Sequence, residues 1–243
     1  MFSNIRIVLV EPSHPGNIGA AARAMKNMCL QQLYLVSPAQ YPHDDATARA
    51  AGADDVLQQA VVVDSLEQAI GDCHLVMGAS ARLRTLAWPQ YSPAEAANVL
   101  ASRCQQGHVA LVFGRERTGL SNDELQLCHY LVNIPSNEQF SSLNLAAAVQ
   151  VLAYEVYQAF QGREQVAELI PSDELPVSQD EMHRYFEHLH DVLVKVEFLD
   201  PQHPKKLMRR LRRLYNRAQP DQREINILRG ILSAVERLIP GQK

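Results

Sequence analysis

Three short segments carry residues whose types and spacing fit a ligand-binding or catalytic site. The first segment, Pro15–Arg23, follows an apolar, β-branched run and contains Gly16, Asn17 and Gly19. A glycine-rich turn after a parallel strand lets a ligand approach the backbone closely, and the amino end of the next helix attracts anions. The segment has neither a GxGxxG nor a Walker A pattern. An ordinary turn followed by a surface Arg23 is therefore the alternative interpretation.

The second segment runs from Gly114 to Leu120 and follows the apolar run Val109–Phe113. It carries the charged triplet Arg115-Glu116-Arg117 between two glycines. Ionisable groups in a loop just beyond a buried strand lie at the sheet edge where sites form. The alternative is a solvated turn with local ion pairs, and such pairs stabilise a fold by only about 0–1 kcal/mol.

The third segment, Ser141–Leu145, precedes a long stretch of small and apolar residues that ends at Phe160. Ser142 and Asn144 are its polar candidates. Serine is a favoured residue at the start of a helix, so Ser141 or Ser142 acting only as an N-cap is the simpler interpretation.

The elements that must position these segments alternate between strand-like and helix-like stretches over the first two-thirds of the chain. This order predicts an α/β domain with a parallel sheet that is covered on both faces. We expect strands at Ile5–Val10, Gln32–Val36, Ala60–Val63, Leu75–Gly78, Val109–Phe113 and Tyr130–Ile134. We expect helices at Gly16–Met28, Ala46–Ala53, Leu66–Ile70, Pro93–Cys104, Asp123–Cys128 and Leu143–Phe160.

The last third has a different character. Residues 162–180 are polar and contain Pro171 and Pro176, which indicates a linker. Three amphipathic helices with apolar residues at i, i+3, i+4 and i+7 follow it. We therefore divide the chain into a domain at 1–162, a linker at 163–180 and a small all-helical domain at 181–243.

Composition excludes several classes of protein. Of the 243 residues, 47% are hydrophobic, so a sizeable core is possible and a disordered chain is not. No apolar run is long enough to span a bilayer, and the N-terminus has the pattern of a strand and not of a signal peptide. The four cysteines lack paired spacing, which argues against a zinc site or disulfides and for a reducing cytoplasm.

Charge is distributed unevenly. The chain has a net charge of −4, yet residues 203–229 hold nine Lys or Arg against two acids. A basic tail on an acidic body suggests an anionic partner. The second C-terminal helix concentrates this charge, and packing of its apolar stripe would leave the basic residues facing outward. The stripe contains Leu207, Met208, Leu211, Leu214 and Tyr215, and the basic residues are Lys205, Lys206, Arg209, Arg210, Arg212, Arg213 and Arg217.

Together, Asn17 with Arg23, Gly114–Leu120 and Ser142–Leu145 resemble, in order and spacing, the three motifs of the TrmH-like branch of the SPOUT methyltransferases. Further similarities extend the resemblance nearly from end to end, at Ala79-Ser80-Ala81-Arg82, Trp88-Pro89 and Asn226-Ile227-Leu228-Arg229-Gly230. The resemblance implies a C-terminal trefoil knot whose loops hold S-adenosylmethionine in a bent shape. It also implies a homodimer with the site near the subunit interface, and no metal.

The activity implied is methylation of a ribose 2′-hydroxyl in tRNA, at a cytidine or uridine that is the first nucleotide of the anticodon loop (position 32). The cofactor contacts implied are Ala79, Ser80, Gly114, Ile134, Ser142 and Leu143. Arg23 is the implied catalytic residue. Because the pKa of a free Arg is above about 12, we interpret Arg23 as an orienting and electrostatic group and not as a base.

The remaining roles follow from the same resemblance. Asn17 would position Arg23, Glu116 would orient its loop, and Ser142 and Asn144 would complete the pocket. Arginine binds phosphate with its planar fork, so Arg82, Arg84 and Arg115 are assigned to RNA. The basic residues of the second C-terminal helix are assigned to RNA because their charge is one-sided. These RNA contacts would be Arg82, Arg84, Arg115, Lys205, Lys206, Arg209, Arg210 and Arg213.

Three alternatives stay open at this point. The chain could be a non-catalytic RNA-binding protein that keeps the basic helix but has lost the cofactor pocket. It could also be a different α/β enzyme that binds a nucleotide at Gly16–Gly19. The third alternative is a 2′-O-methyltransferase that acts on another site in tRNA or on rRNA.

Overall fold

The computed structural model describes residues 2–81, 90–162, 176–202 and 206–239. Within them, a seven-stranded sheet has the order β3-β2-β1-β6-β4-β7-β5, and every neighbouring pair is parallel. The strands are β1 Ile5–Val10, β2 Gln32–Val36, β3 Val61–Val63, β4 Cys73–Ala79, β5 Gln90–Tyr91, β6 His108–Phe113 and β7 Tyr130–Val132. The predicted α/β domain with a parallel sheet is confirmed.

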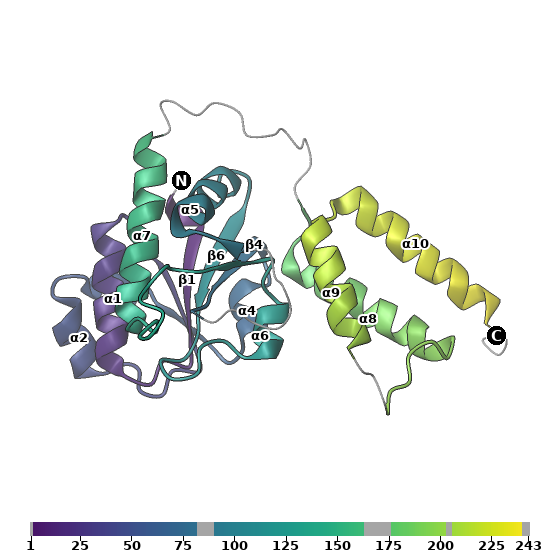
Figure 1. The fold of residues 1–243 in the computed structure, drawn as a ribbon, viewed down its shortest axis with the longest axis horizontal. Coiled ribbons are helices and arrows are strands. Elements are labelled where there is room, and N and C mark those ends of the chain that lie inside the picture. Colours follow the sequence, from purple (N-terminus) through teal and green to yellow (C-terminus); the bar gives the residue numbers. More distant parts are fainter. Residues whose placement is uncertain (1, 82–89, 163–175, 203–205, 240–243) are drawn as a thin grey trace.

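The central strand β1 is buried along its whole length because helices cover both faces of the sheet (Figure 1). Its alternate residues point to opposite faces: Ile7 and Leu9 join one apolar core, and Val8 and Val10 join the other. The first core is covered by α1 Pro15–Asn27, α2 Asp44–Ala50, α3 Asp54–Gln58, α5 Pro93–Arg103 and α7 Leu145–Gln161. The second is covered by α4 Leu66–Ile70 and α6 Asn122–Gln126.

Local sequence signals explain where several helices begin. Ser92 and Ser121 form capping boxes with Glu95 and Glu124, so α5 and α6 each begin with their first backbone amides satisfied. Helix α1 begins at Pro15, a residue whose fixed φ suits the first helical turn. Within α1, a Cβ on Gly19 would lie 1.9 Å from the carbonyl oxygen of Ala46, so α1 and α2 pack backbone against backbone.

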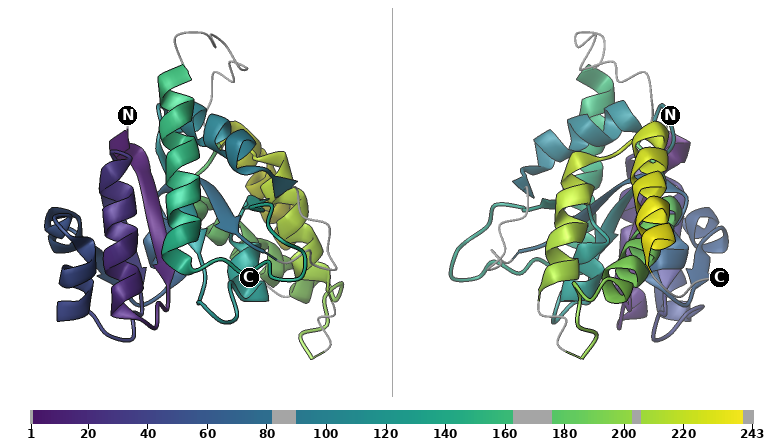
Figure 2. Two further views of the ribbon diagram at one scale, coloured as in Figure 1. Left: turned by 60° about the vertical axis from the view of Figure 1, so that its left-hand side comes forward. Right: turned by 90° about the vertical axis from the view of Figure 1, so that its right-hand side faces the viewer.

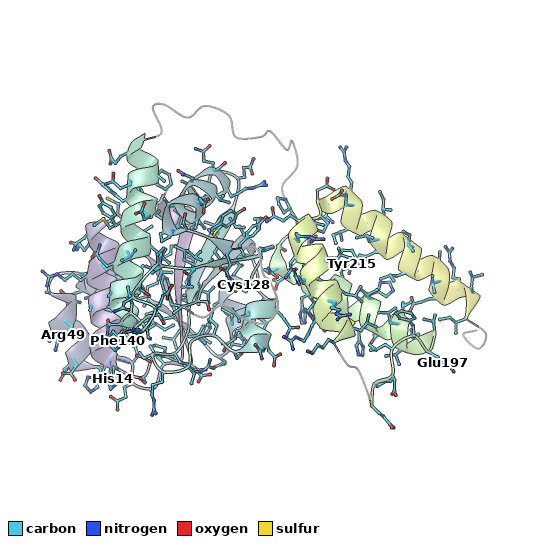
Figure 3. All side chains as sticks on the ribbon, viewed as in Figure 1. His14, Arg49, Cys128, Phe140, Glu197 and Tyr215 are labelled. Carbon is cyan, nitrogen blue, oxygen red and sulfur yellow. The ribbon has the colours of Figure 1, made fainter. Side chains whose placement is uncertain are left out.

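The three predicted C-terminal helices are also present. They are α8 Gln179–Lys195, α9 Leu207–Ala218 and α10 Gln222–Leu238, and they form a bundle beside α4 and α6 (Figures 1 and 2). The bundle has its own core, and Tyr215 packs against it (Figure 3). The ring of Tyr215 lies edge-on to Tyr185 and Phe186.

Some predicted elements differ from the observed ones. The helix expected at Ala46–Ala53 is α2, which ends at Ala50 because Ala51 and Gly52 adopt positive φ angles of 45° and 93°. The helix α3 that follows it was not predicted. The two-residue strand β5 was not predicted. Residues 176–180, expected to be linker, pack with the bundle: Val177 is buried in its core, and α8 already begins at Gln179. Residues 163–175 of the expected linker lie outside the described residues.

Helix α9 is also turned relative to the expected orientation. Leu214, expected to be in the apolar stripe, is 47% exposed. Arg212, expected to face outward, lies 4.6 Å over the ring of Phe186. Its long side chain packs on the apolar core because a guanidinium can cover an aromatic face. Lys205 lies outside the described residues.

Candidate functional site

A cavity of about 260 Å³ lies where three central strands end. Ala79 is the last residue of β4, Phe113 of β6 and Val132 of β7, and all three line the cavity. The carboxyl edge of a parallel sheet is the usual position for a ligand in this class of fold. The six residues expected to contact the cofactor all line this one cavity; they are Ala79, Ser80, Gly114, Ile134, Ser142 and Leu143.

The loop at 114–120 forms one wall of the cavity with its backbone. A Cβ on Gly114 would lie 2.2 Å from both the carbonyl carbon of Gly119 and the amide nitrogen of Leu120, so a side chain there would force the loop open. The amide of Gly119 donates to the carbonyl of Arg115 across 2.9 Å, and the positive φ of Gly119, 68°, closes the turn. Glycine is therefore required at both ends of this loop.

Glu116 joins this loop to the turn before α1. Its carboxylate accepts hydrogen bonds from the backbone amides of Ser13 and His14, from the Ser13 hydroxyl and from the side-chain amide of Asn17. Burial raises the pKa of Glu116, but these hydrogen bonds outweigh it, and the net pKa lies below the usual value. Glu116 is thus a charged anchor that holds the two loops together.

Asn17 links that anchor to the third segment. Its Oδ1 accepts from Nδ2 of Asn144 across 3.0 Å. Asn144 is the N-cap of α7, and its own Oδ1 accepts from the amides of Ala146 and Ala147. The interpretation that Ser141 or Ser142 caps this helix is therefore wrong, because the cap is Asn144 and the helix begins at Leu145. The hydrogen bonds bring all three segments together.

Arg115 has a different environment from the phosphate contact expected of it. Its guanidinium forms bidentate ion pairs with Glu11, which follows β1, and with Glu124 in α6. These carboxylates raise the pKa of Arg115 above its already high value. The local ion-pair interpretation of this turn describes Arg115 well, and a phosphate would have to compete with two carboxylates for it.

Arg23 lies apart from the cavity. It is exposed on α1 and is not among the residues that line the cavity. Arg23 comes six residues after Asn17 on the same helix. It therefore lies about 9 Å further along the helix axis, and its side chain is turned by about 120° from that of Asn17. The structure therefore does not bring Arg23 to the cavity of its own chain. The other two arginines expected to contact phosphate near the cavity, Arg82 and Arg84, lie outside the described residues.

Other residues of the site were not assigned from the sequence. Arg117 is exposed at the cavity, and within the described part of the chain no ion pair is found for it. Ser13 supplies two of the hydrogen bonds to Glu116, and Asn133 donates from its side chain to the carbonyl of Ser80 across 3.0 Å. The charged triplet was a signal for Arg117, whereas Ser13 and Asn133 carry no pattern of their own.

The cavity suits a ligand that is part apolar and part polar. Leu120, Val132 and Ile134 give apolar wall, Ser80 and Ser142 give hydroxyl groups, and Gly114 admits close approach to the backbone. These features fit S-adenosylmethionine, which has an adenine ring, a ribose and a charged amino-acid tail. The described residues hold no group of three side chains placed to bind a metal ion. None of the described helices is long and apolar enough to cross a membrane.

Comparison with known proteins identifies the family. Residues 4–154 match the SpoU rRNA Methylase family, and residues 180–243 match the C-terminal domain of the tRNA methyltransferase TrmJ. The chain belongs to the TrmJ family. Among TrmJ proteins, the tRNA (cytidine/uridine-2′-O-)-methyltransferase of Yersinia enterocolitica is 52% identical over 239 residues, which are 98% of this chain and 93% of that protein.

Two further TrmJ proteins extend the comparison. The tRNA (cytidine/uridine/adenosine-2′-O-)-methyltransferase of Pseudomonas aeruginosa is 51% identical over 249 residues, with 99% of this chain and 97% of that protein covered. The crystal structure of TrmJ from Z. mobilis aligns with a TM-score of 0.83 and 37% identity over 95% of this chain and 98% of that one. The similarity to TrmJ thus includes both the sheet domain and the helical bundle.

Proposed function

We propose that this protein transfers a methyl group from S-adenosylmethionine to a ribose 2′-hydroxyl of tRNA. The observation that carries the proposal is the hydrogen-bonded set of Asn17, Glu116 and Asn144. It joins three segments that are far apart in the sequence beside a cavity lined by all six expected cofactor residues. Such a set is what positions a ligand and an attacking hydroxyl group relative to each other.

The chemistry divides between the cofactor and the chain. S-adenosylmethionine supplies a methyl group that is already activated on a sulfonium. The chain must align the hydroxyl and assist the loss of its proton. Glu116 is unsuited to take that proton, because hydrogen bonds already occupy its carboxylate and hold its pKa low. Arg23 contributes positive charge that stabilises the developing alkoxide and the adjacent phosphate.

A homodimer is part of this proposal. Arg23 lies outside the cavity of its own chain, and α7 exposes Ala147 and Tyr154 along its length. The alanines of α7 differ in burial, because Ala153 is buried within the subunit while Ala147 is exposed. A partner subunit packed on this face would lie beside the site, which is the arrangement that the resemblance implies. The trefoil knot implied by the same resemblance also belongs to the proposal.

We assign tRNA binding to one face of α9. Lys206, Arg210, Arg213 and Arg217 are spaced i, i+4, i+7 and i+11, which places them on one side of the helix, with the exposed Leu214 among them. The helix contains no acid to neutralise this face. Lys206, Arg210 and Arg217 are exposed, whereas Arg213 and Arg209, on the flank of the face, are half-exposed. Residues 1–162 then act as the methyltransferase domain, and the bundle, which includes residues 176–180 of the expected linker, acts as an RNA-binding domain. We place the protein in the cytoplasm, where tRNA is found.

The names of the relatives support a base type for the target nucleotide, and the position in tRNA is the one that the resemblance implies. The names of the Yersinia and Pseudomonas proteins agree on cytidine and uridine and differ on adenosine. We propose cytidine or uridine as the first nucleotide of the anticodon loop. The test maps 2′-O-methylation in tRNA from a strain that lacks this gene, with and without the gene restored. Loss and return of the modification at that nucleotide support the proposal, and an unchanged map in both strains contradicts it.

A further inference from the structure

Buried polar contacts hold the helical bundle against the sheet domain. At the start of α8, the amide of Asp180 donates to the carbonyl of Gly71 across 2.9 Å, and Nε2 of Gln179 donates to the carbonyl of Leu127 across 3.0 Å. From α9, Nδ2 of Asn216 donates to the carbonyl of Gln126 across 2.9 Å. Gln179 is 8% exposed and Asn216 is 3% exposed. The two side-chain amides are therefore committed to this one arrangement.

Two of these contacts are made to the C-terminal end of α6, and the N-terminal end of α6 contacts the cavity loop. Glu124 in the first turn of α6 binds Arg115 of the cavity loop and caps the helix with Ser121. The carbonyls of Gln126 and Leu127 at the other end accept from Asn216 and Gln179. Helix α6 is only five residues long, so it is a short and rigid connection from the cavity loop to the basic helix.

The position of Asn216 on α9 determines which face is turned outward. By helical geometry Asn216 lies about 80–120° around the helix from Lys206, Arg210 and Arg217, and these three residues are exposed. Docking through Asn216 thus keeps Lys206, Arg210 and Arg217 off the interface with the sheet domain. Rotating α9 would break the hydrogen bond from Asn216 to the Gln126 carbonyl, and a buried polar group left without its partner costs about 1–3 kcal/mol.

We infer that Gln179 and Asn216 are positioning residues for the methylation reaction. Through the end of α6 they hold the basic face of α9 in one orientation relative to the cavity, so that a tRNA bound on α9 presents its target ribose to the site. This inference rests on the proposed function. A bundle that is detached but intact still offers its positive charges to tRNA, so affinity persists while productive placement is lost.

Two variants on opposite sides of the interface test this. Asn216→Asp removes the donor and places a carboxylate against the Gln126 carbonyl. Gly71→Glu acts from the sheet domain, because a Cβ on Gly71 would lie 2.5 Å from the carboxylate of Asp180. Gly162→Glu is the matched control. Gly71 and Gly162 are both helix C-caps with a right-handed backbone conformation, but a Cβ on Gly162 would meet nothing within 4 Å.

We expect both interface variants to keep the dissociation constants for S-adenosylmethionine and tRNA within about threefold of the wild type and to lower kcat/KM for tRNA by about tenfold or more. Small-angle X-ray scattering should show a larger radius of gyration for both variants, independently of activity. Gly162→Glu should match the wild type in every measurement. If Asn216→Asp fails to fold, Gly71→Glu decides the question, because it leaves the bundle unchanged.

The outcomes separate this inference from the proposed function. The positioning role is overturned if Gly71→Glu has the kcat/KM and the scattering of the wild type. The proposed function still stands in that case, provided that the wild-type protein methylates tRNA. A fall in tRNA affinity that accounts for the whole loss of kcat/KM also overturns the positioning role. Wild-type protein that does not methylate tRNA refutes the proposed function, and the scattering of the variants still reports whether these residues dock the bundle.

Discussion

Nδ2 of Asn17 donates to Oε1 of Glu116 across 3.1 Å, although 99 residues separate the two in the chain. The bond fixes the orientation of the Asn17 amide, and Oδ1 of Asn17 is then turned to accept from Asn144. Asn144 in turn directs its own Oδ1 at the first amides of α7. Each side-chain amide in this series donates to an oxygen of the next residue. Replacing one amide with a carboxylate therefore removes the donor that the next residue requires.

Asn144→Asp tests this series without removing the helix cap. Aspartate caps a helix as well as asparagine, so the free energy of unfolding should change by less than about 1 kcal/mol. The variant has no donor for Asn17, and we expect kcat/KM for tRNA methylation to fall by about tenfold or more. Asn144→Ala, which also loses the cap, should additionally cost about 1 kcal/mol of stability by chemical denaturation. Wild-type activity of Asn144→Asp would show that the bond to Asn17 has no role in the reaction.

Arg115→Met and Arg117→Met separate a structural arginine from one that is available to RNA. Arg115→Met leaves Glu11 and Glu124 without their partner, and because the pairs are partly exposed we expect a loss of about 1 kcal/mol in the free energy of unfolding. Arg117→Met should leave stability unchanged and weaken tRNA binding. The slope of log affinity against log salt concentration should decrease by about 0.7–0.9 if one phosphate contact is lost. A smaller slope in Arg115→Met, with the slope of Arg117→Met unchanged, would instead show that Arg115 is the phosphate contact.

Arg23→Ala should abolish methylation and leave the affinity for S-adenosylmethionine within a few-fold of the wild type. The reason is the position of Arg23, which is exposed on α1 and away from the lining of the cavity. Isothermal titration and a methyl-transfer assay on the same preparation give the two quantities. Arg49→Ala, another exposed arginine in the same domain, is the control and should behave as the wild type. A near wild-type rate for Arg23→Ala would remove Arg23 from the mechanism.

His129 predicts a dependence of stability on pH. Burial lowers the pKa of His129 to about 4, and its Nδ1 accepts from the amide of Val76. In the unfolded chain the pKa of histidine is about 6.5, so between pH 6.5 and 4 the unfolded state binds the proton and the folded state does not. Acidification through this range therefore destabilises the fold, by about 3 kcal/mol in total from this residue.

The variant His129→Asn retains an acceptor for Val76 but does not titrate in this range. Its free energy of unfolding should fall less than that of the wild type between pH 7 and pH 5, by about 2 kcal/mol. Denaturant titrations at the two pH values measure the difference. Equal losses for both proteins would mean that His129 is protonated in the folded state.

The strands and the three motif segments could be predicted because their signals are local. An apolar run such as Val109–Phe113 bounded by glycines has few interpretations, and Gly114 shows where the chain must turn. The hydrogen-bond and ion-pair partners of the site residues could not be predicted, because they depend on tertiary contacts. The partners of Arg115 come from 104 residues before it and 9 residues after it, and no pattern near Arg115 points to Glu11.

Helix boundaries and helix rotation were the other sources of error. Ser142 and Asn144 are both good caps, and only the path of the preceding loop selects Asn144. On α9 the apolar periodicity is blurred by long side chains, so Arg212 packs inward on Phe186 while Leu214 is exposed. The docking of the bundle rests on the amide side chains of Gln179 and Asn216, residue types that have no distinctive signature in a sequence.

The most direct test of the central claim is methyl transfer from labelled S-adenosylmethionine to a tRNA with one hydroxyl removed. Two synthetic tRNAs are compared that differ only at the first nucleotide of the anticodon loop, a cytidine in one and 2′-deoxycytidine in the other. The wild-type protein should label the first tRNA and leave the second unlabelled, with equal affinity for both. Equal labelling of the two would place the methyl group on a base or on another ribose and would contradict the assignment.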